Sequence, residues 1–149
     1  MGTDIHGVWQ KKVGESWEDV ESEYNQERHY YLFAWLGNVR NGFGFAGTPT
    51  HEPVASMTDC RGLPDDFVTD DGCHVVADFA FICPRRRKYQ DEGDFSVWMG
   101  DHSFSWLHVD EAIANEAFCE DENVAYFVDE CRRLKELHGD VRFVFGFDS

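Results

Sequence analysis

The stretch Val141-Arg142-Phe143-Val144-Phe145-Gly146-Phe147-Asp148 decides the fold that the sequence predicts. Apolar side chains recur there at every second position, which is the spacing of one face of a β-strand; they are Val141, Phe143, Phe145 and Phe147. A strand with an aromatic face needs a hydrophobic core against that face. We therefore expect a strand over residues 141–148 with its Phe face in the core.

A helix is predicted immediately before this strand. Apolar residues recur there at intervals of three and four: Val124, Phe127, Val128, Cys131, Leu134 and Leu137. Acids at 120–122 precede this pattern and basic residues at 132, 133 and 135 lie late in it, which suits the helix dipole. Gly139 is the expected end of the helix.

The rest of the chain predicts further strands and helices around the same core. Asp4 to Val13 and Ser16 to Val20 form an expected hairpin, with Gly14 in its turn. A helix is expected over residues 28–40 with Asn25 as a possible cap, and a strand over residues 102–109 leads into a helix over 111–118 capped by Asp110.

Residues from Asn41 to about Phe95 show no such pattern. Gly, Pro and Asp clusters interrupt them, and one short apolar run covers Val75 to Ile82. The sequence therefore predicts one α+β domain over residues 1–149. It has a small antiparallel sheet, made of the N-terminal hairpin, a middle strand and the C-terminal strand, packed on two to three helices, with a long irregular insertion.

Composition narrows the class of protein. Hydrophobic residues make up 42% of the 149 residues and aromatics 15%, so the chain should fold. A formal charge of −16 opposes direct binding to a nucleic-acid backbone, but suits either a surface that stays in solution or a mimic of nucleic acid. No stretch is apolar enough to span a membrane, no export signal is recognisable, and five cysteines form no C-x-x-C pair. A cytoplasmic protein with reduced thiols is expected.

Aspartate and histidine recur near the ends of the expected strands. Asp4 and His6 are two apart and point to one face of the first strand, Asp101-His102 begins the third strand, and Asp148 ends the last. Asp4, His6 and His102 are candidate ligands of a divalent metal ion, and His6, Asp101 and His102 are candidate catalytic groups. The alternative is that both histidines are ordinary strand residues bonded to neighbouring backbone.

Arginines and tryptophans form a second set of candidates. Arg28 is placed on the apolar stripe of the first helix, and therefore expected to be partly buried, while Arg40 ends that helix and Arg61 opens an Arg-Gly-Leu-Pro turn. Trp35 and Trp106 are candidate stacking partners for a base. The alternative for the arginines is pairing with some of the 29 acids. The basic run at 85–88 reads as a solvated loop, with a grip on phosphate as the alternative.

Several motifs together resemble a family of small bacteriophage and prophage proteins to which no reaction is assigned. The chain begins M-G-x-D-I-H and contains R-G-L-P at 61–64 and H-S-x-S-W-L at 102–107; residues 28–33, 39–41 and 141–148 add to the likeness. The resemblance spans nearly the whole chain, and it implies a phage origin and the cytoplasm of an infected bacterium.

Two functions are expected. The first is a phage accessory protein that binds or hydrolyses a phosphate-containing nucleotide, which would counter host defence signalling; whether catalysis occurs stays open. The alternative is an acidic mimic of nucleic acid that inhibits a basic host protein, such as a nuclease, and needs no active site.

Overall fold

The structure is a computed structural model of the chain that describes residues 2–59, 61–67, 99–100, 102–118 and 120–149. The apolar run Val75 to Ile82, the basic run at 85–88 and the candidate catalytic residue Asp101 lie outside the described residues. Within them, no helix is both long and apolar enough to cross a membrane.

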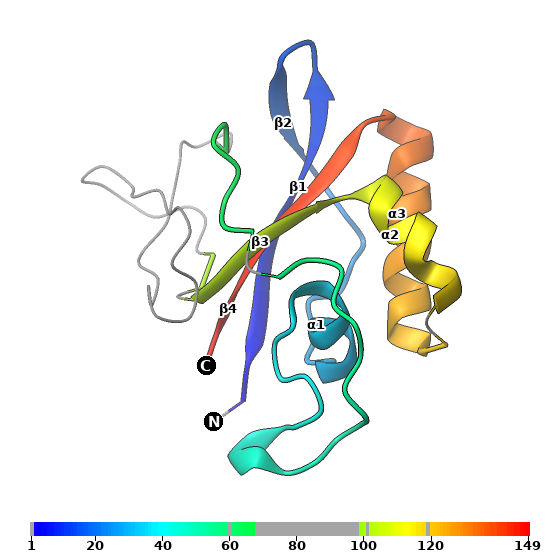
Figure 1. The fold of residues 1–149 in the computed structure, drawn as a ribbon. Helices are drawn as coiled ribbons and strands as arrows, with labels where there is room; N and C mark the ends of the chain where they lie inside the picture. Colours follow the sequence, from blue (N-terminus) through cyan, green and yellow to red (C-terminus); the bar gives the residue numbers. More distant parts are fainter. Residues whose placement is uncertain (1, 60, 68–98, 101, 119) are drawn as a thin grey trace, which may run out of the picture.

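A four-stranded antiparallel sheet forms the centre of the described fold (Figure 1). Its strands are β1 (Asp4–Val13), β2 (Ser16–Val20), β3 (His102–His108) and β4 (Val141–Asp148), in the order β2-β1-β4-β3. The C-terminal strand therefore lies between the N-terminal strand and the middle strand. The α+β class and the antiparallel sheet predicted from the sequence are confirmed.

The register between β1 and β4 separates two faces of the sheet. Ile5 pairs with Phe147, and Trp9 pairs with Phe143. Because directly paired residues share a face, these four apolar side chains lie on the same face of the sheet. Asp4 pairs with Asp148 and His6 with Gly146, so these residues belong to the opposite face. We call the face that carries Ile5 and Trp9 the helix face, and the face that carries Asp4 and His6 the second face.

Three α-helices of the described chain cover the helix face: α1 (Tyr30–Gly37), α2 (Val109–Asn115) and α3 (Glu122–His138) (Figure 1). Helix α3 follows the predicted pattern, with the Asp121 side chain accepting from the backbone N–H groups of Asn123 and Val124, and with Gly139 at its C-terminus. One hydrophobic cluster joins all three helices to Trp9 and to the phenylalanines of β4.

Helix α1 is shorter than the predicted 28–40. It begins after His29, and not near Asn25, and it ends where Asn38 adopts a left-handed conformation with φ 59°. Arg28 therefore precedes the helix, and its side chain is 52% exposed, so the predicted partial burial of Arg28 is wrong. Helix α2 likewise begins one residue before the expected cap Asp110, because the side chain of His108 caps it.

A smaller cluster lies on the second face of the sheet. Leu63, Phe67, Met99, Phe104 and Val144 are all buried there. Gly146 of β4 permits this packing, since a Cβ at this position would overlap the carbonyl oxygen of Met99 and the ring of Phe104. The segment at 61–67 is therefore fixed against the sheet by buried side chains.

Candidate functional site

The predicted site residues fall at three separate places. Asp4, His6, Arg28, Arg40 and His102 lie where β1 begins and β4 ends; Trp35 lies in α1; and Arg61 and Trp106 lie on the second face. Each place has its own chemistry.

On the second face, the end of the sheet carries two polar side-chain pairs. His6 Nε2 is 2.8 Å from Asp148 Oδ2, and Arg28 Nε donates to Asp4 Oδ1 at 2.7 Å. The hydrogen bond from Arg28 lowers the pKa of the Asp4 carboxyl below its ordinary value. Asp4 and His6 do share a face, as predicted, and each engages a partner that is not one of the candidate metal ligands, Arg28 for Asp4 and Asp148 for His6.

On the helix face, the same end of the sheet carries a chain of hydrogen bonds. Arg40 Nε donates to Thr3 Oγ1 at 2.9 Å, Thr3 Oγ1 lies 2.9 Å from Ser149 Oγ, and Ser149 Oγ lies 2.9 Å from His102 Nε2. His102 Nδ1 in turn contacts Ser103 Oγ at 2.9 Å. A neutral His102 that accepts at Nε2 and donates at Nδ1 satisfies every bond of this chain.

The candidate metal ligands do not come together. His102 pairs with Phe147, whose ring is on the helix face, whereas His6 pairs with Gly146 on the second face. Among the residues that the structure describes, no group of three His, Cys, Asp or Glu side chains could hold a metal ion. The structure separates Asp4 and His6 from His102 by the thickness of the sheet.

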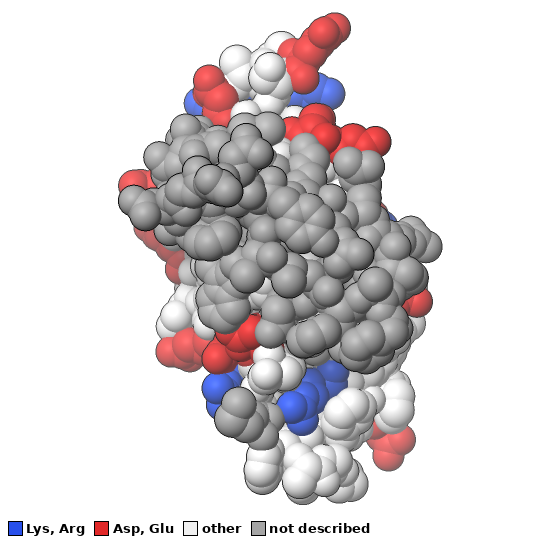
Figure 2. Space-filling view, turned by 90° about the vertical axis from the view of Figure 1, so that its left-hand side faces the viewer, with Lys and Arg blue, Asp and Glu red and all other residues white. Residues whose placement is uncertain are grey.

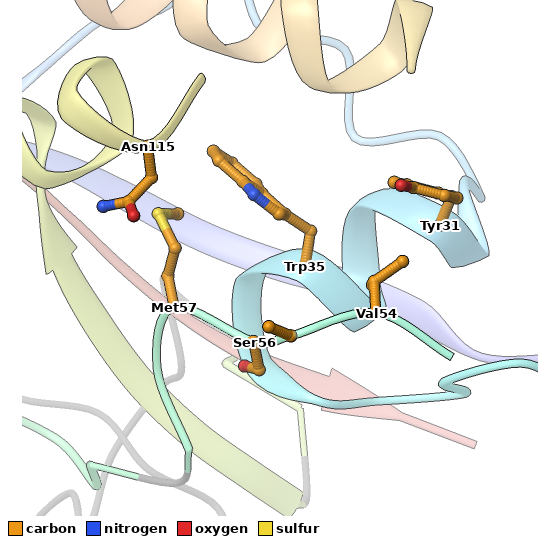
Figure 3. Close-up of a pocket in the computed structure, with 7 residues that line it drawn as sticks. Tyr31, Trp35, Val54, Ser56, Met57 and Asn115 are labelled. Atoms are coloured by element: carbon orange, nitrogen blue, oxygen red, sulfur yellow. The ribbon is translucent and has the colours of Figure 1, made fainter. Parts of the chain in front are cut away.

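Trp35 borders a cavity of about 470 Å³ that Figure 3 shows. Tyr31 and Trp35 come from α1, Val54 and Met57 from the segment that follows it, and Asn115 from the end of α2. Trp35 is only 4% exposed, because most of its ring packs in the core. The residue is therefore chiefly a core side chain that offers one edge to the cavity.

A second cavity of about 520 Å³ lies on the second face, at the opposite end of the sheet from His6. We call it the tryptophan groove, and its lining residues are Lys12, Trp17, Arg61, Leu63, Pro64, Asp65, Asp66, Trp106, His108 and Arg142. The groove unites the predicted ligand residues Arg61 and Trp106 with residues of β1, β2 and β4.

Arg142 forms the first cation–aromatic stack of the groove. Its side chain is 5% exposed, and the guanidinium carbon lies 4.1 Å from the centre of the Trp17 ring. Arg142 donates to Gln10 Oε1 through Nε and NH2, at 3.0 and 2.8 Å, and to Asp66 Oδ1 through NH1 at 2.8 Å. Burial lowers the pKa of Arg142, while the Asp66 carboxylate opposes that shift.

Arg61 forms the second stack. Its guanidinium carbon lies 5.0 Å from the centre of the Trp106 ring, and its NH1 and NH2 groups donate to the two carboxylate oxygens of Glu111 at 2.9 and 2.7 Å. The hydrogen bond from Arg61 lowers the pKa of Glu111. The planar fork is thus fixed in position over an indole ring.

Two further basic side chains line the groove. Lys12 is exposed, with its ammonium 5.6 Å from the centre of the Trp17 ring. His108 accepts the N–H of Asp110 at Nδ1 and contacts the Asp140 carboxylate through Nε2. Cationic side chains and the indole rings of Trp17 and Trp106 therefore line the groove together with the carboxylates of Asp65 and Asp66.

The alternative raised for the histidines was bonding to neighbouring backbone, but the contacts described above join His6 and His102 to the side chains of Asp148, Ser103 and Ser149. The alternative raised for the arginines was pairing with acids. Arg28 and Arg61 pair with acids, whereas Arg40 donates to Thr3 Oγ1 and to the carbonyl oxygen of Gly44. Sequence reasoning missed Trp17 and Arg142. The signal for Arg142 was present, since a single charged residue inside an otherwise apolar strand needs a partner when the strand is central.

The fold and the groove define this chain as an antiparallel α+β protein with a cationic, aromatic groove on one sheet face. Comparison with protein-family models, with curated proteins and with solved structures found no match.

Proposed function

We propose that the protein binds a phosphate-containing nucleotide in the tryptophan groove. One observation carries the proposal: two guanidinium groups, each stacked on an indole ring, line a single cavity. Indole rings stack on bases, and guanidinium groups donate paired hydrogen bonds to phosphate oxygens. A volume of about 520 Å³ falls within the range usual for small-molecule sites.

The biological setting of the proposal comes from the sequence. The resemblance to phage and prophage proteins supports an accessory role in an infected bacterium, where binding or hydrolysis of a signalling nucleotide would counter host defence. The resemblance motif R-G-L-P contributes Arg61, Leu63 and Pro64 to the groove, and H-S-x-S-W-L contributes Trp106.

Thermal melting against a panel of nucleoside mono-, di- and triphosphates and cyclic dinucleotides tests the proposal. A nucleotide at 100 times its dissociation constant should add about 2.7 kcal/mol to the free energy of unfolding, which raises the melting temperature by several degrees. Chromatography of the same mixtures would show hydrolysis as new products.

Lys12→Gln and Lys11→Gln provide the matched pair of variants. Both variants make the same change in net charge. Lys12 lines the groove, whereas its neighbour Lys11 pairs with Val141 on the helix face. Lys12→Gln should weaken nucleotide binding by about twofold to fivefold, the effect of a single exposed charge contact, and Lys11→Gln should not. Equal effects of the two variants would place the ligand elsewhere.

A panel in which no nucleotide raises the melting temperature would overturn the proposal. Exposed acids at 15, 18, 21, 23 and 27 would then make the nucleic-acid mimic the better account. Binding of a basic host nuclease by the purified protein would support that account.

A further inference from the structure

The carboxylate of Asp66 joins the two partners of the Arg142 stack. Its Oδ1 accepts from Arg142 NH1 at 2.8 Å, and its Oδ2 accepts from Trp17 Nε1 at 3.1 Å. Asp66 is 58% exposed, whereas Arg142 is 5% exposed. The cation is therefore built into the sheet, and the anion reaches it from the rim of the groove.

The donors that Asp66 meets are fixed by other contacts. Gln10 Oε1 holds the Nε and NH2 groups of Arg142, and Gln10 Nε2 is itself held by Asp19 Oδ1 at 2.8 Å. The NH1 group of Arg142 and the indole N–H of Trp17 consequently converge on one anionic group. A guanidinium N–H and an indole N–H that converge in this way fit the oxygens of a phosphate equally well.

The backbone at Asp66 is fixed by the burial of neighbouring side chains. Leu63 and Phe67 are buried on either side of it and fix the segment against the sheet. Burial by itself would raise the pKa of Asp66, but the hydrogen bonds from Arg142 and Trp17 and the positive charge of Arg142 together lower it below its ordinary value. Asp66 is thus an anion at neutral pH.

We propose that the Asp66 carboxylate occupies the subsite of a nucleotide's terminal phosphate and competes with it for Arg142 and Trp17. This inference rests on the proposed function. A terminal phosphate carries up to two negative charges at neutral pH, against one on the carboxylate, and it offers more acceptor oxygens. The ligand class is therefore a nucleotide with a terminal phosphate, and binding requires Asp66 to rotate out of the groove.

Isothermal titration of Asp66→Ala and Asp66→Asn with ADP and with inorganic pyrophosphate tests the inference. Both variants should bind both probes about tenfold more tightly than the wild type, because a hydrogen-bonded charged competitor is gone. Asp129→Asn on α3 makes the same change in net charge far from the groove, with its carboxylate 73% exposed, and should leave both affinities unchanged.

Melting temperatures give a second expected signature. Without ligand, Asp66→Ala should melt below the wild type, because the buried guanidinium of Arg142 loses its carboxylate partner. Pyrophosphate should restore much of that loss and shift the variant more than it shifts the wild type. A cyclic dinucleotide, which has no terminal phosphate, should gain less from the substitution; an equal gain would overturn the terminal-phosphate assignment.

Failure of the inference differs from failure of the proposed function. If the wild type binds ADP and the Asp66 variants bind it no more tightly, Asp66 is not a competitor, while nucleotide binding stands. If neither wild type nor variants bind any nucleotide, the proposed function itself falls. If both variants fail to fold, the indole N–H resonance of Trp17 in the wild type decides: pyrophosphate must shift it, and a constant resonance overturns the inference.

Discussion

Glu111 shows how one side chain can serve a helix and a groove together. Its Oε1 accepts the backbone N–H of His108 at 3.0 Å, which completes the cap of α2, and both of its oxygens hold Arg61 over Trp106. The position of Arg61 in the groove therefore depends on the start of a helix.

We predict that Glu111→Gln lowers the free energy of unfolding by about 1 kcal/mol at pH 7, a value reduced for the partial exposure of this pair. The pKa of Glu111 is lower in the folded protein, so its stabilising effect is present above the unfolded carboxyl pKa and is lost as the pH falls through the folded pKa. Urea unfolding at pH 7 and in acid should therefore show a difference between variant and wild type that disappears in acid.

Glu136→Gln, at an exposed position on α3, is the control and should change stability by less than about 0.5 kcal/mol at either pH. A difference at Glu111 that persists in acid would mean that the packing of its side chain, and not its charge, stabilises the fold.

At this scale the sequence predicted residue types better than residue neighbours. Arg61 and Trp106 were both named as ligand-binding candidates, and they do lie together. His6 and His102 were grouped because both stand at strand ends, yet the irregular register between His102 and Ser105 and the pairing of His102 with Phe147 put them on opposite faces. Face assignment across a β-bulge requires the register, which spacing along the chain does not contain.

Among the elements, strands were predicted more accurately than helices. The bounds of β1, β2 and β4 agree with the alternating patterns that predicted them. Helices α1 and α2 start after His29 and His108, and histidine is not a preferred capping residue, so their true starts gave no recognisable signal. Asn38 ends α1 early through a backbone conformation that its side chain tolerates.

Side chains pack against both faces of β4, and the close packing at Gly146 predicts that Gly146→Ala strongly destabilises the fold. The added methyl group would overlap the backbone of Met99 as well as the Phe104 ring, and a backbone group in a packed sheet cannot move aside cheaply. We expect a loss of about 2 kcal/mol or more in the free energy of unfolding, measured by urea denaturation. A loss below about 0.5 kcal/mol would show that Met99 does not pack on β4.

The whole molecule carries a net charge of −16, and its surface shows the surplus. In Figure 2, acidic side chains lie at several places around the edge of the face, whereas Lys and Arg form smaller groups toward its two ends. Like charges at such density repel one another in the folded state more than in the expanded chain.

We predict that sodium chloride stabilises the protein. Raising the salt from about 10 mM to about 500 mM shortens the Debye length from roughly 30 Å to below 10 Å, and this should raise the melting temperature by several degrees. Calorimetry at both concentrations measures the shift. A lower melting temperature at high salt would mean that attraction within ion pairs outweighs the repulsion among the acids.

The central position of β4 also has a consequence during synthesis on the ribosome. His6 and Asp148 bind each other although 142 positions separate them, and β4 pairs with β1 on one side and β3 on the other. While the ribosome is still making or enclosing residues 141–148, β1 and β3 lack the strand that joins them. The apolar side chains that β1 and β3 place on the helix face, such as Trp9 and Leu107, then lack the phenylalanines of β4 that complete their core. The sheet must therefore assemble after translation has passed residue 148, and the nascent chain spends its synthesis with that face open to chaperones.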